Sequence, residues 1–441
     1  MAKRVYAPLV AAIVIVMLTA VGVSAQDYIP SPGVLSPDQV DFGGATVTII
    51  GQVTADNFAE GTPKAGRLEE AMKLFNIGKI EFLYRPGAEV IMTRIMTGEA
   101  THDIIYDDWR GQYFTMARHG MLYPLDELLP QEYYDNLYRV DNIIHTQILA
   151  LRGHRYTFGH IYGNCFRPTG LVYNQSMLER EGLPDIYELW KAGKWTWEEA
   201  EKLAKAVTRD TNGDGSIDQW GIANRRLDYG LYINNAQFVK KDPDGKYRYG
   251  WADEEAVWIF EKIAEWYRNG YVVPVELDAD NRIKSGHVLM QFGADHPEGG
   301  VANNGDILVT APLPTGPHTD RPIYPEWAVK YAAIPVTAED PAALVALHDF
   351  LFRKDDLDFD TWLMSEVSAR FPNQKSVEHL VYAIETWNGD VEWINAFSQT
   401  PDVKLSWHEI APVLRGEVAA RSYLESKAPV AQAEIDRMFN Q

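Results

Sequence analysis

Cysteine is almost absent from this sequence, and Cys165 is the only one in 441 residues. A single thiol cannot form an intrachain disulfide, even in an oxidising compartment, so we expect Cys165 to act as a small buried apolar residue. Positive charge is also scarce, because 41 lysines and arginines face 62 aspartates and glutamates and leave a net charge of −21. This balance argues against nucleic acid or an anionic membrane as the principal partner.

Apolar runs of membrane-spanning length are missing beyond the N-terminus. Residues 1–25 have the order of a secretory signal, in which Lys3 and Arg4 precede an apolar stretch and small residues end the segment. This order favours cleavage before Gln26 over an uncleaved membrane anchor. No cysteine follows the small residues, so lipid attachment is not expected. The sequence therefore predicts a protein released into the periplasm or the extracellular space.

The short motifs of several enzyme classes are absent as well. The sequence contains no His-Glu-x-x-His, Gly-x-Ser-x-Gly, Ser-x-x-Lys, P-loop or Gly-x-Gly-x-x-Gly. A glycoside hydrolase stays open as an alternative, because a single sequence cannot show the separation of its two carboxylates.

The chain that remains after residue 25 is long for one hydrophobic core and predicts two large lobes. Strands expected at 45–50, 80–84 and 102–106 alternate with helices expected at 65–77 and 88–97. This alternation is typical of a mainly parallel α/β sheet. Sheets of that kind bind ligands beyond the carboxyl ends of their strands.

Asp108 and Trp109 follow the third of these strands. They fit a ligand site, but a helix N-cap beside a core aromatic residue explains them equally well. The chain also carries 13 tryptophans and 23 tyrosines. These side chains combine an apolar plane with a polar handle, as sugar recognition requires, although most of them are expected to build cores.

A loop rich in oxygen side chains follows the next helix. Thr196 and Glu199 have the spacing of a capping box, and the apolar residues that follow predict one buried helix face. The loop then spaces its oxygens as a Ca²⁺-binding loop does, with glycine at position 6, through Asp210, Asn212, Asp214, Ser216 and Asp218. Position 12 is Gly221 rather than glutamate. We favour a structural Ca²⁺ site, and the alternative is an Asx-rich turn that binds no ion.

Four further helices are expected in the second half of the chain. An apolar stripe at 253–269 ends at Asn269-Gly270, a common helix stop. The others are expected at about 341–352, 375–386 and 417–438.

Six segments, taken in order, carry a resemblance to a known family. They are GEATHDIIYDDWRGQYFTMARHGMLYPLDELL, LVYNQSMLEREGLP, KWTWEEAEKLAKAVTRDTNGDGSIDQWGIA, SGHVLMQFGAD, APLPTGP and YAAIPVTAEDPAALVALHDFLF. Together they resemble the extracellular solute-binding proteins of family 1, which are the carbohydrate-binding components of ABC importers and include the maltodextrin-binding type. The resemblance covers nearly the whole mature chain.

The resemblance implies an α/β, two-lobed periplasmic-binding-protein fold of type II, with a hinge of crossing strands between the lobes. The N-terminal lobe would comprise 27–156 and 332–380, and the C-terminal lobe 170–325 and 384–441. A carbohydrate, expected to be an oligosaccharide, would bind in the cleft between the lobes, and a membrane permease would recognise the closed, monomeric protein.

The resemblance also implies which residues contact the ligand. Four would bond sugar hydroxyls, and they are Asp108, Asn164, Asp228 and Asp295. Four would supply aromatic faces, and they are Trp109, Tyr229, Trp327 and Trp407. One departure from the maltodextrin-binding type is the sequence Ala294-Asp295-His296, which lacks the tryptophan of that type. This departure puts malto-oligosaccharide itself in doubt as the ligand.

Two further alternatives concern the role of such a fold. The same fold would serve a peptide, a polyamine or an organic ion, because an acidic protein suits a cation. A sensory role, in which the liganded protein signals to a membrane receptor, also fits the sequence.

Overall fold

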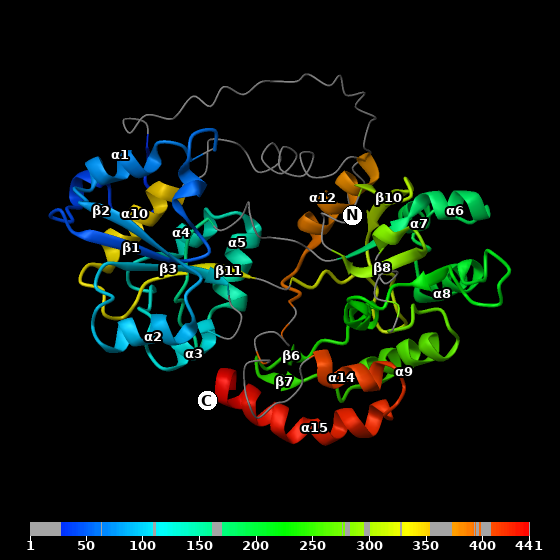
Figure 1. The fold of residues 1–441 in the computed structure, drawn as a ribbon. Helices are drawn as coiled ribbons and strands as arrows, with labels where there is room; N and C mark the ends of the chain where they lie inside the picture. Colours follow the sequence, from blue (N-terminus) through cyan, green and yellow to red (C-terminus); the bar gives the residue numbers. More distant parts are fainter. Residues whose placement is uncertain are drawn as a thin grey trace, which may run out of the picture.

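The computed structural model describes residues 28–62, 64–108, 112–160, 170–275, 277, 283–294, 300–326, 329–352, 373–391, 393, 397 and 407–440. Two separate main sheets form within these residues, and helices cover each of them (Figure 1). The predicted two-lobed α/β architecture is therefore confirmed. The expected signal segment lies outside the described residues. Across the described part of the chain, no helix has the length and apolarity needed to cross a membrane.

The first sheet has the strand order β11-β3-β1-β2. Its strands are β1 (Thr46–Gly51), β2 (Lys79–Tyr84), β3 (Asp103–Asp108) and β11 (Lys330–Ala333). β1 pairs in parallel with both β2 and β3, as expected, whereas β11 returns from the second half of the chain and pairs antiparallel with β3. Parallel pairing brings the carboxyl ends of β1, β2 and β3 to one edge.

Helices cover both faces of this sheet. α1 (Arg67–Leu74) and α10 (Pro341–Phe352) lie on one face, and α2 (Ala88–Met96) and α3 (Gln112–Arg118) lie on the other (Figure 1). β1 is accordingly buried on both sides, and its side chains divide between two apolar clusters. A strand with two buried faces reads as a continuous apolar run, which explains why its position was predictable. The shorter helices α4 (Gln131–Asp135) and α5 (Arg139–Ile143) follow in the same lobe.

The second sheet has the order β5-β8-β4-β10-β9. Its strands are β4 (Gly170–Asn174), β5 (Trp220–Ile222), β8 (Val288–Ala294), β9 (Gly300–Val301) and β10 (Ile307–Ala311). Only the β5–β8 pair among them is parallel, and the other pairs are antiparallel. A separate hairpin consists of β6 (Val239–Lys241) and β7 (Tyr247–Tyr249).

Helices of the second lobe surround this sheet. They are α6 (Gln175–Glu181), α7 (Ile186–Lys191), α8 (Trp197–Val207), α9 (Glu254–Arg268), α12 (Gln374–Thr386), α14 (Trp407–Leu414) and α15 (Ala420–Ile435). The helix expected at 253–269 is confirmed within one residue at each end, and its apolar stripe is buried from Ala256 to Ile263. α10 and α12 also match their predicted ranges closely.

The predicted capping box of α8 is only half right. Thr196 is the N-cap residue, but its side chain makes no capping hydrogen bond. Glu199 instead accepts a hydrogen bond from Lys202 Nζ at 2.5 Å on the outer face of the helix. The predicted apolar face is confirmed, since Ala200, Leu203 and Ala204 are buried.

α12 lies on the second sheet rather than in the first lobe, where the predicted range 332–380 placed its first half. Ser376 Oγ accepts a hydrogen bond from the backbone N of Thr310 in β10 at 3.0 Å, and the ring of His379 lies 3.1 Å from Thr310 Oγ1. The passage from the first lobe to the second therefore falls between α10 and α12, before the predicted boundary. Figure 1 shows the two helices on different sheets.

Candidate functional site

Polar side chains gather at the carboxyl edge of the first sheet. Asp107 and Asp108 end β3 and are buried, with exposed fractions of 7% and 6%. Gln52, directly after β1, donates from Nε2 to Asp108 Oδ2 and, at 3.4 Å, to Asp107 Oδ1. Buried carboxylates at a strand end are strong acceptors for hydroxyl donors. The first lobe thus presents two carboxylates that one amide holds together.

Gly51 makes this close approach possible. Its φ of 133° lies in the region that favours glycine, and a Cβ there would meet the Tyr106 carbonyl oxygen at 1.9 Å. The chain then turns so that the backbone N of Gln52 donates to the Tyr106 carbonyl oxygen at 2.8 Å. Any other residue at position 51 would push β1 away from β3 and move Gln52 off the carboxylates.

The second lobe places an acidic residue on the 3₁₀ segment Leu227–Asn234. Asp228 is partly buried, and desolvation raises the pKa of its carboxyl to about 6, while the nearby Arg226 opposes this shift. A carboxyl with a pKa of about 6 changes charge within the physiological range. Asp228 therefore differs in kind from an ordinary surface aspartate.

The ring of Tyr229, the residue after Asp228, is buried and has no face open to a ligand. The ring is only 1% exposed, and the Arg226 guanidinium lies over it, 4.5 Å from the centroid. Gly293 at the end of β8 packs against the same ring, since a Cβ at that position would lie 2.5 Å from Tyr229 Cδ2. In this conformation Tyr229 is a packing residue, and its predicted stacking on a ligand is a prediction that needs the ring to become accessible.

The positions of the other predicted ligand residues are known only along the chain. Trp109, Asn164, Asp295 and Trp327 lie outside the described residues, and Trp407 begins α14 with its side chain also outside them. Trp109 directly follows β3, and Asp295 directly follows β8. Their roles stay predictions.

Sequence reasoning missed Gln52 and Asp107 as members of the first-lobe cluster. The available signal was the Gly51-Gln52 pair after a strongly apolar strand, which marks a tight strand end. Nothing in the local pattern separates Asp107 from Asp103, the buried partner of Arg94 at the opposite end of β3.

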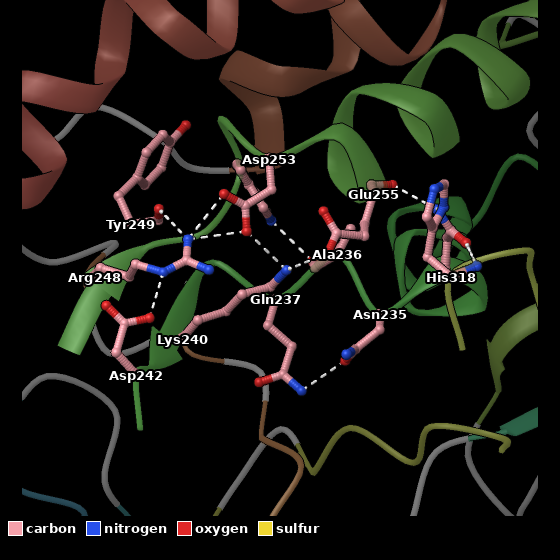
Figure 2. A network of polar contacts seen from close by, with 12 residues as sticks. Asn235, Ala236, Gln237, Lys240, Asp242, Arg248, Tyr249, Asp253, Glu255 and His318 are labelled. Atoms are coloured by element: carbon pink, nitrogen blue, oxygen red, sulfur yellow. Dashed lines mark hydrogen bonds and ion pairs between the residues drawn. The ribbon is translucent and has the colours of Figure 1, made fainter. Parts of the chain in front are cut away.

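The asparagines near the end of the 3₁₀ segment are used in structural contacts. Asn234 Nδ2 donates to the Glu255 carbonyl oxygen and lies 2.8 Å from His318 Nδ1. Figure 2 shows the adjoining network, in which the Arg248 guanidinium bonds Asp242 and Asp253 and so ties the β6–β7 hairpin to the start of α9. This network thus fixes the position of the β6–β7 hairpin relative to α9.

The predicted Ca²⁺ loop is exposed from residue 211 to residue 217, and Asp210 and Asp218 at its ends are half-buried. Asp210 accepts hydrogen bonds from the backbone N of Gly213 at 2.6 Å and of Gly215 at 2.7 Å, and these bonds lower the pKa of Asp210. Asp218 accepts from Thr211 N and Oγ1 at 2.7 and 2.8 Å. Within the described residues, no three His, Cys, Asp or Glu side chains are grouped so that they would hold a metal. A Ca²⁺ ion here would depend on amide, hydroxyl and backbone oxygens as well, and the site stays a prediction.

Two contacts join segments that are far apart in the sequence. Arg139 of α5 donates to three carbonyl oxygens at the end of α12, those of Ile384, Glu385 and Trp387, at 2.6–2.9 Å. Arg321 forms a bidentate ion pair with the buried Asp390, with both contacts at 2.9 Å. The first contact satisfies the open carbonyls of a helix end and links the first lobe to α12, and the second joins the segment before β11 to the segment after α12.

Two α/β lobes that the chain crosses repeatedly, each with polar groups at its strand ends, define the class of two-lobed ligand-binding proteins. Within that class, residues 55–357 match the bacterial extracellular solute-binding proteins, and the chain belongs to this family. The predicted family is therefore confirmed. No protein with a curated description matches the sequence.

Solved structures show the same fold. One is the extracellular solute-binding protein from Staphylococcus aureus in complex with maltose, with 12% identity, a TM-score of 0.61, and coverage of 89% of this chain and 98% of that one. Another is the maltose/maltodextrin-binding domain MalE from Bdellovibrio bacteriovorus bound to maltotriose, with 19% identity, a TM-score of 0.54, and coverage of 88% and 99%. A third is a solute-binding protein from Agrobacterium radiobacter K84 in complex with ribitol, with 18% identity, a TM-score of 0.54, and coverage of 90% and 100%.

Proposed function

We propose that this protein is exported, captures a carbohydrate between its two lobes and delivers it to the membrane permease of an ABC importer. The observation that carries the proposal is the pair of buried carboxylates at the end of β3, held by Gln52. Sugar hydroxyls are donors that suit such acceptors, and each charge-assisted bond contributes about 1.5–3 kcal/mol. The family and the ligands named for its structural neighbours support a sugar or sugar alcohol as the solute.

The proposal includes binding without turnover. The acidic residues of the candidate site lie on separate lobes, Asp107 and Asp108 on the first and Asp228 on the second. Closure of two lobes around a ligand is a hinge transition that a membrane partner recognises, and it requires no bond to break. The protein is expected to act as a monomer in the periplasm or outside the cell after cleavage behind residue 25.

The test is a thermal-shift screen of the mature protein at fixed calcium, followed by calorimetry on each compound that stabilises it. The panel holds mono- and oligosaccharides, sugar alcohols, amino acids, peptides and polyamines. A ligand at 100 times its Kd stabilises the native state by about 2.7 kcal/mol, which gives a clear shift in Tm. A saccharide that binds and is recovered intact supports the proposal.

Other outcomes of this screen contradict the proposal. A response to polyamines or peptides alone would replace the carbohydrate with a cationic or peptide solute. Release of a shorter sugar during incubation would indicate a glycoside hydrolase. Mass spectrometry of the secreted protein, in which Gln26 is expected at the N-terminus, tests export separately.

A further inference from the structure

The segment after α15 reaches from the second lobe onto the first. α15 itself packs in the second lobe, where Tyr249 of β7 donates from Oη to the Leu424 carbonyl oxygen at 3.3 Å. The π-helical segment Asp436–Asn440 follows α15 directly, and Asn440 Nδ2 donates to the Tyr247 carbonyl oxygen at 2.8 Å. Figure 1 shows this end of the chain near α3, which covers the first sheet. The segment thus rests on one lobe and meets the other.

Phe439 is the apolar part of this contact between the lobes. Its ring stacks on Tyr247 of β7 with centroids 4.4 Å apart, and it meets Phe114 of α3 in an edge-on arrangement at 5.4 Å. Phe114 also lies 5.9 Å from Trp393, which follows α12. Aromatic rings in such arrangements attract each other beyond the gain from their burial. One phenylalanine therefore joins aromatic residues of both lobes.

Glu434 near the end of α15 is the polar part of the same contact. It is buried, forms an ion pair with Arg437, and lies 3.9 Å from Arg118 Nη1 of α3. Arg152 of the first lobe donates to the Arg437 carbonyl oxygen at 3.0 Å. Burial lowers the pKa of Arg118, and the charges of Arg437 and Arg152 lower it further, whereas Glu434 opposes this shift. Three arginines therefore surround one buried carboxylate at the boundary between the lobes.

The single carboxylate makes this contact sensitive to charge. If Glu434 were neutral, Arg118 of the first lobe and Arg437 of the second would repel each other, because partly buried charges are weakly screened. The contact also lies apart from the link between Arg139 and the end of α12 (Figure 1). Two separate links hold the lobes more firmly than one, since each opposes a rotation about the other.

We propose that Glu434 and the segment Asp436–Asn440 form a latch that holds the two lobes in this relative orientation before any ligand binds. The contacts of the latch described above include none of the candidate ligand residues, so it acts on the orientation of the lobes rather than on ligand recognition. A ligand that fits this orientation meets two lobes already in place, whereas one that needs another orientation must first break the latch. The inference holds for any solute, so it can fail while the proposed function stands.

The test measures the ligand-free mature protein by small-angle X-ray scattering and by hydrogen exchange. Arg118→Ala and Glu434→Gln should each increase the radius of gyration, because the lobes separate more often. The amides of Asp436–Asn440 should exchange about tenfold faster in both variants, the factor that corresponds to the loss of one charged contact.

Salt separates the two parts of the latch. In about 1 M salt the Debye length falls to about 3 Å, so Glu434→Gln should return to the radius of the wild type as the arginines cease to repel each other. Phe439→Leu removes the ring and leaves the charges in place, and its larger radius should be the same at low and at high salt.

Arg421→Ala is the matched control. It removes an ion pair of the same helix, between Arg421 and Glu254 of α9 at 2.8 Å, in which both partners belong to the second lobe. This variant should keep the radius and the exchange rates of the wild type at both salt concentrations. Far-UV circular dichroism checks that every variant remains folded.

The latch is excluded if Arg118→Ala and Glu434→Gln change neither the radius nor the exchange rates, or if Arg421→Ala changes them equally. An increase in the radius of Glu434→Gln that persists in high salt would contradict the role given to the arginines. None of these measurements uses a ligand, so the saccharide screen decides the proposed function separately.

Discussion

The two lobes present their acidic groups in different ways. In the first lobe, Asp107 and Asp108 end a parallel strand and share one amide donor, Gln52. In the second lobe, Asp228 lies on a 3₁₀ segment, and desolvation raises its pKa to about 6. The regular strand end supplies preorganised acceptors, whereas the irregular segment supplies an acceptor whose charge depends on pH. We infer that the pH dependence of ligand binding comes from the second lobe.

The cores of the two lobes differ in the number of histidines that they bury. The first lobe buries His145 and His348, and burial lowers their pKa values to about 4 and about 3. The second lobe buries His379, whose pKa is lowered to about 3. His145 is bonded to Thr157 Oγ1 and to the Gly159 carbonyl oxygen, while neither ring nitrogen of His348 has a hydrogen-bond partner among the residues that the structure describes. The first lobe thus depends more strongly on neutral histidine.

The largest expected effect is therefore acid destabilisation of the first lobe. An unfolded histidine takes up a proton near pH 6.5, but these buried ones do not, so stability is lost as the pH falls from 6.5 towards 4. Each fully buried histidine accounts for about 3 kcal/mol by pH 4. Hydrogen exchange measured by lobe should show the first lobe opening at a higher pH than the second. His348→Phe should lessen this difference and His379→Phe should widen it, whereas earlier opening of the second lobe would contradict the comparison.

The next effect concerns Asp228→Asn. The folded pKa of about 6 exceeds the unfolded value of 3.8, so the ionised carboxylate destabilises the ligand-free protein increasingly as pH rises from 3.8 to 6. The substitution should raise the free energy of unfolding by roughly 2 kcal/mol at pH 7 and leave it unchanged at pH 4. It should also weaken saccharide binding at pH 7 and abolish the decline in affinity that we expect for the wild type between pH 7 and pH 5. Asp135→Asn, at an exposed position of α4, is the control and should change none of these quantities.

The first-lobe counterpart is Asp108→Asn, for which an effect on ligand binding alone is expected. Loss of one charged acceptor should weaken saccharide binding by about 1.5–3 kcal/mol, measured by calorimetry. An unchanged affinity in the Asp108→Asn variant would show that the ligand does not bond this carboxylate and would contradict the comparison.

The sequence was sufficient where burial follows a local period. β1 was predictable because it is a continuous apolar run buried on both faces, and α9 was predictable because every third to fourth side chain faces a core. It was insufficient where neighbours distant in sequence decide exposure. Tyr84 and Tyr106 are both register partners of Gly51, but Tyr84 lies on the edge strand β2 and is exposed, whereas Tyr106 lies on an inner strand and is buried.

Two further differences have the same cause. α12 has an apolar stripe that would fit either sheet, and its hydrogen bonds to Thr310 assign it to the second. Tyr229 has the composition of a stacking residue, but Arg226 and Gly293 enclose its ring. In both positions the residue type was informative about chemistry and uninformative about which surface it would meet.

The smallest effect is expected at the predicted Ca²⁺ loop of the second lobe, residues 210–218. Asp210 and Asp218 already accept backbone N–H bonds, but an ionised carboxylate has about four lone-pair sites and keeps some for a cation. If Ca²⁺ binds, adding it to chelator-treated protein should raise Tm by a few degrees, since the loop is exposed and only its own order is gained. Asp210→Asn should remove this shift and leave saccharide affinity unchanged, because the loop contributes no residue to the candidate site. An unchanged Tm on adding Ca²⁺ would identify the loop as an Asx-rich turn, in which the amide bonds alone hold the carboxylates.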